Sequence, residues 1–320
     1  MEFTSSSELP SGAGWQYEPK WDGFRPIVAR RRRVIQLWSK AGKPLERYFP
    51  EIVGCISKIR SQRFVLDGEL VVATRRAGSF DDLLQRIHPA QSRIVALAKS
   101  NPAKLVVFDM LSELKAGDIS ERPLKDRRRM LERFAKSFRP ARCIALSPVT
   151  SDRRTAQRWL ARSRSEFDGV VAKRLDQPYE SGSRKYGVKV KRKCSADCVV
   201  GGFRYAANGN GVGSLLLGLY DGRGRLNHVG FVSGFEATER VRLAKRLRPL
   251  IEPPGFTGRA PGGASRWRKR ADDWLPLAPK LVVEVTFDKV TSGRIRHAAG
   301  FVRWRPDKHA RQCTMMQLSR

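Results

Sequence analysis

The segment Glu18–Arg25, which reads EPKWDGFR, combines residue types that could carry out covalent chemistry on a phosphate. Lys20 stands two residues before Asp-Gly, and Arg25 stands two residues beyond that glycine, a spacing that suits a nucleophile displayed at a tight turn between strands. A free lysine amine has a pKa of roughly 10.4, so it attacks phosphorus only where neighbouring positive charge or a bound metal helps it lose its proton. Because Lys-x-Asp-Gly also occurs often by chance, the prediction depends on the segments that follow.

Three of these segments place an acid or an aromatic ring beside a short apolar run. In LDGEL (66–70), Glu69 follows an expected turn, where its carboxylate could accept hydrogen bonds from ribose hydroxyls. In VVFD (106–109), Phe108 ends an apolar strand and could stack on a purine. The segment DGVVAK (168–173) puts Asp168 and Lys173 at the two ends of one short strand.

Two further segments are basic. Lys189 and Lys191 have the period-two spacing that points both ammonium groups to the same face of a strand. RWRPDK (303–308) is a basic cluster, with Arg296 just upstream. Each segment also has a purely structural interpretation, such as a core aromatic, a turn acid or a solvated strand edge. Their joint order along one chain favours a shared site.

The elements that must position these residues are short strands alternating with helices, which predicts an α+β fold. Met1–Gly14, rich in Ser, Gly and Pro, is expected to be flexible. In order, we expect a hairpin of Phe24–Arg30 and Val34–Ser39, a helix over Tyr48–Ile59, strands Phe64–Leu66 and Glu69–Ala73 around an Asp67-Gly68 turn, a helix over Ser79–Arg86, a strand over Leu105–Asp109, a helix over Pro123–Ala135 and a strand over Val170–Lys173.

The pattern changes near Lys193, after which strands dominate. Five strands and one helix in this second part fit a small barrel of the oligonucleotide-binding type. The Pro/Gly-rich stretch Glu252–Ala264 predicts a loop. The expected strands are Val199–Tyr205, Ser214–Tyr220, Leu226–Phe231, Leu281–Asp288 and Phe301–Arg305, and the helix is Glu236–Leu250.

Composition points to a polyanionic partner. The chain has 320 residues, enough for two ordinary domains or one large one, and 41% of them are hydrophobic, so a real core can be buried. Lys and Arg number 63 against 31 Asp and Glu, a net charge of +32. Basic side chains that neutralise phosphates release condensed counterions, so nucleic acid is the favoured partner. A membrane surface is the weaker alternative, because no apolar run is long enough to cross a bilayer and no signal peptide is evident.

The cysteines and histidines predict neither a disulfide scaffold nor a metal cluster. The five cysteines are scattered, and Cys194 and Cys198 are followed by no second pair at zinc-finger spacing. The four histidines are scattered as well. We therefore expect no structural zinc and a reducing cytoplasmic compartment.

Taken together, the segments YEPKWDGFR, LDGEL, DGVVAKR, KVKRKCSADCVVGGFR, SLLLGLY, LVVEVTFD and RHAAGFVRWRPDK resemble the motif series of covalent nucleotidyltransferases. Their wording is most similar to the bacterial ATP-dependent DNA ligase C family and to the ligase domain of bacterial ligase D, from Trp15 to the C-terminus. The resemblance implies a nucleotidyltransferase (ATP-grasp-like adenylation) domain over residues 1–192 and an oligonucleotide-binding-fold β-barrel domain over residues 193–320. It also implies nick sealing through a lysyl-AMP intermediate.

The resemblance assigns roles by position in the motif series. Lys20 would be the nucleophile, Glu69 would hold the ribose and contribute to metal binding, and Phe108 would stack on adenine. The cofactors would be ATP and Mg²⁺ or Mn²⁺. The remaining implied residues are Glu18 and Arg25 as ATP contacts, Asp168 at the divalent metal, Lys189 and Lys191 at the α-phosphate, and Arg303, Arg305 and Lys308, assisted by Arg296, at the departing pyrophosphate.

Two positions depart from the family pattern. Many members have Glu where this chain has Asp168, which is one methylene shorter, so contact with the metal would run through water. Many ligases have Arg where Ser39-Lys40-Ala41-Gly42 offers Lys40, which keeps the charge but loses the bidentate geometry that arginine presents to phosphate. Neither change removes the nucleophile.

Other functions stay open at this point. An RNA ligase or an mRNA-capping guanylyltransferase would use the same lysine chemistry, and an inactive nucleic-acid-binding module is an alternative of another class. An NAD-dependent ligase is disfavoured, because the extra N-terminal and zinc-binding segments typical of such enzymes are not recognisable. For a DNA ligase we expect nicked double-stranded DNA as the substrate, a Ku-like end-binding protein or a repair polymerase as a partner, no membrane association, a monomer, and a cytoplasmic, nucleoid-associated location.

Overall fold

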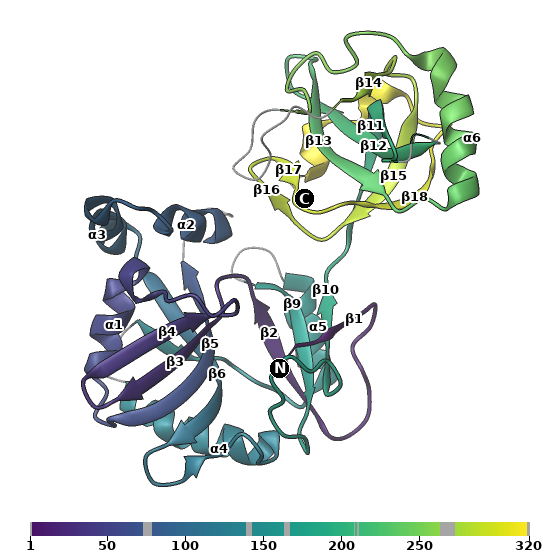
Figure 1. Ribbon diagram of the computed structural model, residues 1–320. Coiled ribbons are helices and arrows are strands. Elements are labelled where there is room, and N and C mark those ends of the chain that lie inside the picture. The colour runs from purple at the N-terminus through teal and green to yellow at the C-terminus, as the bar shows by residue number, and fades with distance from the viewer. Residues whose placement is uncertain are drawn as a thin grey trace. The chain divides into compact units, whose positions relative to one another are not determined.

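The computed structural model describes residues 2–72, 79–138, 143–162, 167–207, 209, 211–262 and 273–318 (Figure 1). The chain divides into two compact units, Met1–Arg192 and Lys193–Arg320. The first unit combines sheets with helices, and the second is built mainly from strands. The predicted α+β class is confirmed.

The first unit contains two sheets. The larger runs in the order β4-β3-β5-β6-β7 with β8 beside β6, and the smaller in the order β1-β10-β9-β2. The pairs β1–β10 and β8–β6 are parallel, and the others are antiparallel. The strands are β1 (Thr4–Ser6), β2 (Trp15–Trp21), β3 (Pro26–Arg31), β4 (Val34–Ser39), β5 (Arg63–Val72), β6 (Ala103–Glu113), β7 (Gly117–Asp118), β8 (Ile144–Leu146), β9 (Phe167–Arg174) and β10 (Gly187–Lys191).

Most of the helices of this unit lie against these sheets (Figure 1). In α1, the first residue Pro50 lacks only an N–H that the first turn of a helix leaves unused, and Ile52 and Ile56, one turn apart, are both fully buried. In α4, Phe134 lies edge-on to Phe64 of β5 with the ring centroids 5.0 Å apart. The helices are α1 (Pro50–Ser57), α2 (Ser79–Arg86), α3 (Gln91–Ser100), α4 (Leu124–Ala135) and α5 (Arg153–Arg162), with short 3-10 turns at Glu46–Tyr48 and Lys136–Phe138.

The predicted turn at Asp67-Gly68 is wrong. These residues lie inside one continuous strand, β5, which runs from Arg63 to Val72. Gly68 lies so close to β6 that an added Cβ would come within 2.7 Å of the Val106 carbonyl oxygen, and the register between the two strands is irregular here. Glycine is required at this point for the close approach of two strands and not for a turn.

The N-terminal segment is also more ordered than its composition predicts. Thr4–Ser6 forms β1 and pairs in parallel with β10, so that Thr4 faces Val188 and Ser6 faces Val190. This pairing joins parts of the chain more than 180 residues apart. Local composition contains no information on such a distant partner.

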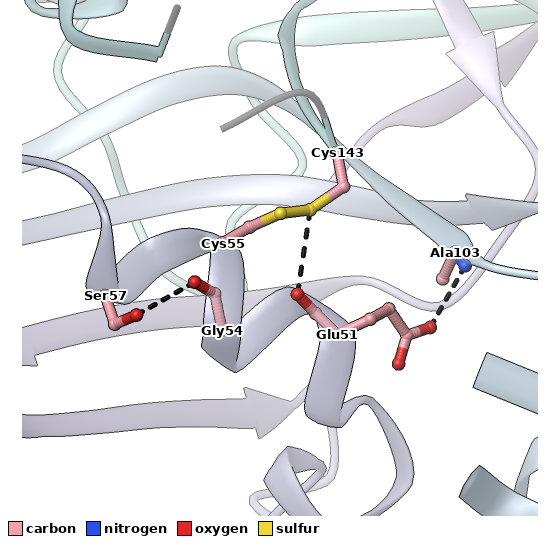
Figure 2. Close-up of a disulfide and its surroundings, with 6 residues drawn as sticks. All are labelled: Glu51, Gly54, Cys55, Ser57, Ala103 and Cys143. Atoms are coloured by element: carbon pink, nitrogen blue, oxygen red, sulfur yellow. Dashed lines mark hydrogen bonds between the residues drawn. A yellow bond between two sulfur atoms is a disulfide. The ribbon is translucent and has the colours of Figure 1, made fainter. Parts of the chain in front are cut away.

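The expectation that the cysteines form no disulfide is wrong for one pair. Cys55 in α1 and Cys143, which immediately precedes β8, are joined by a disulfide with their Cα atoms 6.3 Å apart (Figure 2). The Cys143 sulfur also lies 3.6 Å from the Glu51 carbonyl oxygen. The two cysteines are 88 positions apart, and only the packing of α1 beside β8 brings them together.

The second unit contains a strongly bent antiparallel sheet in the order β13-β12-β11-β15-β18, with β14 beside β11. The five strands and the helix expected here are confirmed. Of the loop predicted over Glu252–Ala264, residues 252–262 contain no regular element, and the last two residues lie outside the described part of the chain. The elements are β11 (Cys194–Tyr205), β12 (Val212–Tyr220), β13 (Leu226–Ser233), α6 (Ala237–Leu247), β14 (Leu275–Pro276), β15 (Val282–Phe287), β16 (Val290–Thr291), β17 (Arg294–Ile295) and β18 (Gly300–Trp304), with 3-10 turns at Arg248–Leu250, Ala310–Gln312 and Met315–Leu318.

The ends of this sheet meet, which closes it into a barrel. Ala299, directly before β18, forms a bridge with Val232 of β13, and its N–H donates to the Phe231 carbonyl at 2.8 Å. The register shifts within β11–β12, β12–β13 and β15–β18, and such irregularities supply the bending that closure requires. Apolar side chains that point inward from all five strands form a single core. Among the residues described in both units, no helix is long and apolar enough to span a bilayer.

Candidate active site

A hollow of about 240 Å³ lies within the first unit and gathers most of the residues that the sequence singled out. It is bounded by residues of both sheets, which the chain brings together from its N-terminal segment to β10. The residues that line it are Glu2, Phe3, Glu18, Pro19, Lys20, Trp21, Arg25, Lys40, Glu69, Phe108, Val171, Lys173 and Lys189.

Lys20 occupies an irregular position near the end of β2. Pro19 pairs with Val170 and Trp21 with Phe167, so two residues of β9, Asp168 and Gly169, lie opposite Lys20 alone. A bulge of this kind changes the direction in which a side chain points. Gly169 is required here, because an added Cβ would come within 2.2 Å of the Val190 carbonyl oxygen.

Asp168 links two lysines. Its Oδ1 lies 2.7 Å from Lys20 Nζ, and its Oδ2 lies 3.1 Å from Lys191 Nζ. The side chain of Asp168 is 7% exposed, whereas Lys20 keeps 24% of its surface open. Lys189 faces the hollow from the same strand as Lys191, and burial, reinforced by Lys20 and Lys191, lowers the pKa of Lys189. Of the two lysines predicted at the α-phosphate, Lys189 therefore lines the hollow and Lys191 is bound to the Asp168 carboxylate.

Glu69 is fixed by the loop that carries the Asp-Gly motif. The Gly23 N–H donates to Glu69 Oε1 at 3.1 Å, and Phe24 pairs with Leu70 just beyond it. A Cβ on Gly23 would come within 1.8 Å of the Leu70 carbonyl oxygen, so this contact demands glycine. Burial raises the pKa of Glu69 to about 8, although the positive charges of Lys20 and Arg25 oppose the shift.

The raised pKa of Glu69 predicts a pH-dependent stability. The folded protein binds the proton of the Glu69 carboxyl group more tightly than the unfolded chain does. The free energy of unfolding that this proton contributes is therefore complete below about pH 4.5, and it is lost as the pH rises through about 8. Glu69→Gln, which keeps the acceptor for Gly23, should therefore stabilise the ligand-free protein increasingly as the pH rises. Melting temperatures of the wild type and the variant at pH 5, 6.5 and 8.5 measure this. The exposed Glu121→Gln serves as the control, and a difference for Glu69→Gln that does not change with pH would refute the prediction.

Arg25 is anchored by a carboxylate on β5. Its Nε and a terminal nitrogen donate to Asp67 at 3.0 and 2.5 Å, and the Tyr179 hydroxyl donates to the same carboxylate at 2.8 Å. Burial disfavours the charged guanidinium, but Asp67 outweighs this and raises the pKa of Arg25. The guanidinium carbon lies 5.5 Å from the centre of the Phe108 ring, so Arg25 is held beside the predicted adenine platform.

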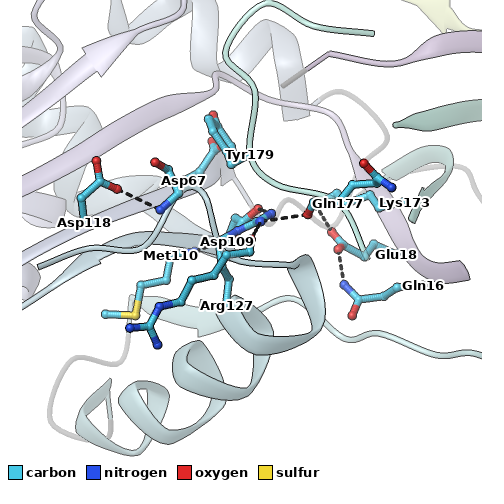
Figure 3. A network of polar contacts seen from close by, with 12 residues as sticks. Gln16, Glu18, Asp67, Asp109, Met110, Asp118, Arg127, Lys173, Gln177 and Tyr179 are labelled. Carbon is cyan, nitrogen blue, oxygen red and sulfur yellow. Dashed lines mark hydrogen bonds and ion pairs between the residues drawn. The ribbon is translucent and has the colours of Figure 1, made fainter. Parts of the chain in front are cut away.

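Glu18 takes part in a buried polar network (Figure 3). Lys173 Nζ donates to one carboxylate oxygen at 2.9 Å and Gln16 Nε2 donates to the other at 2.7 Å. Lys173 Nζ also lies 4.6 Å from the centre of the Phe108 ring. Both oxygens of Glu18 are thus engaged by the protein, and its role in the ligand-free state is to fix Lys173 against Phe108.

A second ion pair shown in Figure 3 supports the strand behind Phe108. Arg127 of α4 donates from two nitrogens to the two oxygens of Asp109, both at 3.0 Å, and both side chains are almost fully buried. Arg127 also donates to the Gln177 carbonyl at 3.2 Å. These bonds fix the middle of β6, which presents Phe108.

The three predicted cations of the C-terminal cluster lie in the second unit and are all bonded to acids there. Arg305 and Lys308 donate to the two oxygens of Asp197 in β11, at 2.9 and 2.6 Å, and Arg305 also pairs with Asp307 at 2.8 Å. Arg303 donates to Glu284 of β15 at 2.7 Å. Arg296 directly follows β17, and its backbone N–H donates to the Lys289 carbonyl.

Several residues around the hollow were not among the predicted site residues. Lys173 closes the DGVVAK segment but was noted only as a strand-end base. Glu2 and Phe3 fall in the segment expected to be flexible. In the second unit Asp197 was missed as well, although an acid inside the apolar run of β11 was a usable signal, since buried carboxylates need partners.

Comparison with known proteins agrees with this arrangement. The family described as "ATP dependent DNA ligase domain" matches residues 5–191, and "ATP dependent DNA ligase C terminal region" matches residues 208–308. DNA ligase C2 of Mycolicibacterium smegmatis is 40% identical, over 99% of this chain and 93% of that protein. The multifunctional non-homologous end joining protein LigD of the same organism is 30% identical over 92% of this chain, which spans 36% of that protein.

A solved structure shows the same fold. The ligase domain of LigD from M. tuberculosis aligns with a TM-score of 0.50 at 25% identity, covering 98% of this chain and 97% of that one. The first unit is accordingly an adenylation fold and the second an oligonucleotide-binding fold. The matched domains and the 40% identity over nearly the whole length show that the chain belongs to the family of ATP-dependent DNA ligases.

Proposed function

We propose that this protein seals nicks in double-stranded DNA with ATP, through AMP bound covalently to Lys20. The observation that carries the proposal is the position of Lys20, which opens into a hollow with an aromatic platform, Phe108, and a second lysine, Lys189. A ligand that combines a purine with phosphates matches a hollow lined by an aromatic ring and several cations. Membership of the ATP-dependent ligase family supports the choice of ATP and DNA.

The first proposed step is transfer of AMP to the protein. Lys20 Nζ forms a bond to the α-phosphorus of ATP, the bond from that phosphorus to the bridging oxygen breaks, and pyrophosphate leaves with the electron pair. The amine gives up its protons to solvent. Before this attack Lys20 must leave the Asp168 carboxylate, 2.7 Å away in the ligand-free state. Lys189 is placed to stabilise the charge that spreads over the phosphate oxygens.

In the next two steps the AMP is transferred to the DNA and then released. An oxygen of the 5′-phosphate at the nick attacks the phosphorus of the lysyl-AMP and releases Lys20, and the 3′-hydroxyl then attacks the 5′-phosphorus and expels AMP. Glu69 and Arg25 would hold the nucleotide sugar and phosphate through these steps, and Lys40 would contact a phosphate. Glu18 would contribute indirectly, through Lys173 and its contact with Phe108.

A divalent cation fits this donor set. Asp168, beside Lys20, presents two carboxylate oxygens that now bind lysines, and the carboxylate of Glu69 lines the hollow. Among the residues described, no group of three or more His, Cys, Asp or Glu side chains forms a cage for a metal. Mg²⁺ is commonly held by one or two carboxylates plus substrate phosphates, so Asp168, with Glu69, would be its protein ligands. The bound ion would supply positive charge at the phosphates.

The two units would divide the work. Residues 1–192 would form the adenylation domain that carries Lys20, and residues 193–320 the domain that brings Arg303, Arg305 and Lys308, with Arg296, to the pyrophosphate. Because the Arg305 and Lys308 side chains now bind Asp197, they would have to release it or share their remaining N–H groups with the phosphates.

Incubation of the purified protein with labelled ATP or GTP, followed by nicked DNA or nicked RNA, tests the function. We expect an adduct with ATP alone and joining of the DNA nick. An adduct with GTP would favour a capping guanylyltransferase, and joining of RNA alone would favour an RNA ligase. Binding of DNA without any adduct would support the inactive binding module. Intact mass spectrometry before incubation shows whether the protein already carries AMP.

Binding of nicked duplex should weaken steeply with salt. Each phosphate contact contributes a slope of about −0.9 to the logarithm of affinity against the logarithm of salt, so six to ten contacts would cost about three to five orders of magnitude between 50 and 200 mM. The net charge of +32 supports a footprint of that size. Fluorescence anisotropy over this salt range measures the slope. A flat response would contradict a phosphate-dominated interface.

A Ku-like end-binding protein or a repair polymerase is the partner class we propose, since the relatives include an end-joining ligase. Such recruitment and the DNA substrate would place the enzyme at the nucleoid. We further propose that the enzyme is a monomer. Co-sedimentation of the purified chain with a Ku-like protein on blunt duplex ends would test this, and ligase that does not enter the complex would argue against it.

A further inference from the structure

A second hollow, with a volume of about 1080 Å³, lies in the first unit at the end of the larger sheet where β3 ends and β4 and β5 begin. Arg25 of the catalytic hollow directly precedes the other end of β3. A strand rises about 3.3 Å per residue, so Arg31, the last residue of β3, lies roughly 20 Å from Arg25. This second hollow is called the basic hollow here, because its lining includes the arginines Arg31, Arg32, Arg33, Arg60 and Arg63.

Hydrogen bonds to the backbone hold the turn between β3 and β4 in place. The Arg32 N–H donates to the Gln62 carbonyl at 2.6 Å. The neighbouring Arg30 donates from Nε to the Arg32 carbonyl at 3.1 Å and from a terminal nitrogen to the Ile59 carbonyl at 2.5 Å. The arginines of the turn are therefore fixed beside the segment that joins α1 to β5.

This arrangement has two costs that a surface without a ligand would have no reason to carry. Arg31 and Arg63 lie directly opposite each other in neighbouring strands, where like charges destabilise a sheet. Arg32 has a φ of 55°, a left-handed conformation that favours Gly or Asn in a two-residue hairpin turn. Within the described ranges, no acidic side chain forms an ion pair with any of the five arginines. Their positive charge is therefore open to an anionic ligand.

Two exposed apolar side chains distinguish between the possible anions. Guanidinium groups bind carboxylates and phosphates alike. Val34 and Leu114 also line the basic hollow, and they are 59% and 55% exposed. Apolar groups of a ligand would stabilise a complex by covering them, and the sugar–phosphate backbone of DNA offers few such groups. β4, which begins at Val34, is the edge strand of the sheet, so the backbone at its start can pair with an extended peptide.

We propose that the basic hollow is a docking surface for an extended acidic segment of a partner protein, in which apolar side chains alternate with carboxylates. The carboxylates bind the arginines, and the apolar side chains cover Val34 and Leu114. Among the described residues, those that line the basic hollow are all different from those that line the catalytic hollow. Docking therefore recruits the protein without occupying the site of nucleotide transfer, and the inference does not depend on the proposed function.

The probe is a fluorescein-labelled peptide in which Glu alternates with Leu, compared with a matched peptide in which Ser replaces each Leu. Anisotropy titrations measure the affinity of each peptide. We expect Arg33→Gln and Arg60→Gln each to weaken binding of the Glu-Leu peptide about two- to fivefold, because each removes one exposed ion pair. The control Arg223→Gln removes an exposed arginine from the turn between β12 and β13, and it should match the wild type.

Leu114→Ser tests the apolar part of the surface. It should weaken binding of the Glu-Leu peptide and leave the weaker binding of the Glu-Ser peptide unchanged. Equal affinity of the wild type for the two peptides, or an equal response of Arg33→Gln and Arg223→Gln, would overturn the proposal.

Titration of the same variants with an unbroken DNA duplex examines the competing ligand. We expect Arg33→Gln and Arg60→Gln to bind duplex as Arg223→Gln does. A loss of duplex affinity that the control does not share would assign the basic hollow to DNA and not to a peptide. Because peptide binding is measured without ATP or a nick, it decides this inference even if the protein seals no DNA.

Discussion

Lys20→Ala is expected to abolish covalent labelling by ATP and to reduce sealing of an unmodified nick by more than about a thousandfold, because Lys20 would form the phosphorus–nitrogen bond of the adduct. Among the described residues, the lysines that line the same hollow are Lys40, Lys173 and Lys189. Lys20 differs from these lysines in its place at the bulge of β2, opposite two residues of β9. Lys189 lies on β10, which β9 separates from the strand of Lys20.

Denaturing gels and intact mass spectra with labelled ATP check this result. The exposed Lys115→Ala, on the turn after β6, is the control and should label like the wild type. A nick that already carries AMP should still be sealed measurably by Lys20→Ala, since the final attack comes from the 3′-hydroxyl. Labelling that survives the substitution would remove Lys20 from the mechanism, whereas loss in Lys115→Ala as well would point to a general defect.

The sequence predicted those parts of the site that depend on local pattern. The period-two spacing of Lys189 and Lys191 correctly predicted a strand. It did not predict that Lys191 forms an ion pair with Asp168. Phe108 does lie on an apolar strand, and its ring does face the hollow. In such cases a residue and its neighbours in sequence determine the direction of the side chain.

Where the prediction failed, a distant contact decides the structure. Asp67-Gly68 has the composition of a turn, yet Gly68 allows β5 and β6 to approach, and β6 is more than 30 residues away. The N-terminal segment has the composition of a flexible tail, yet β10 gives it a partner. The disulfide of Cys55 and Cys143 likewise depends on two elements far apart in the chain. No local window contains these partners.

The same limit applies to polar partners in the site. The motif series identified Asp168 and Lys20 separately, but their ion pair follows from a bulge in which two residues of β9 oppose one of β2. Spacing along each strand does not reveal the register between strands. Only the pairing of β2 with β9 shows that Lys20, the proposed nucleophile, is bound to an acid in the ligand-free protein.

Arg305→Ala and Lys308→Ala are expected to reduce self-adenylylation by about a hundredfold or more, while sealing of a pre-adenylated nick stays close to the wild type. The reason is that these cations would stabilise the departing pyrophosphate, which takes part only in the first step. Single-turnover rates for each step, measured with ATP and with pre-adenylated DNA, check the expected separation. Lys280→Ala, an exposed lysine of the same unit, is the control.

The contact of both cations with Asp197 provides a second, structural explanation that the experiment must exclude. If Arg305 and Lys308 act only by binding Asp197 and so stabilising the barrel, Asp197→Asn should weaken that contact. It should then lower self-adenylylation and sealing of a pre-adenylated nick in parallel with the melting temperature. If they act on pyrophosphate, Asp197→Asn releases them and leaves self-adenylylation largely intact. Equal loss of both activities in Arg305→Ala, reproduced by Asp197→Asn, would assign the cluster to folding; loss of the first step alone would assign it to catalysis.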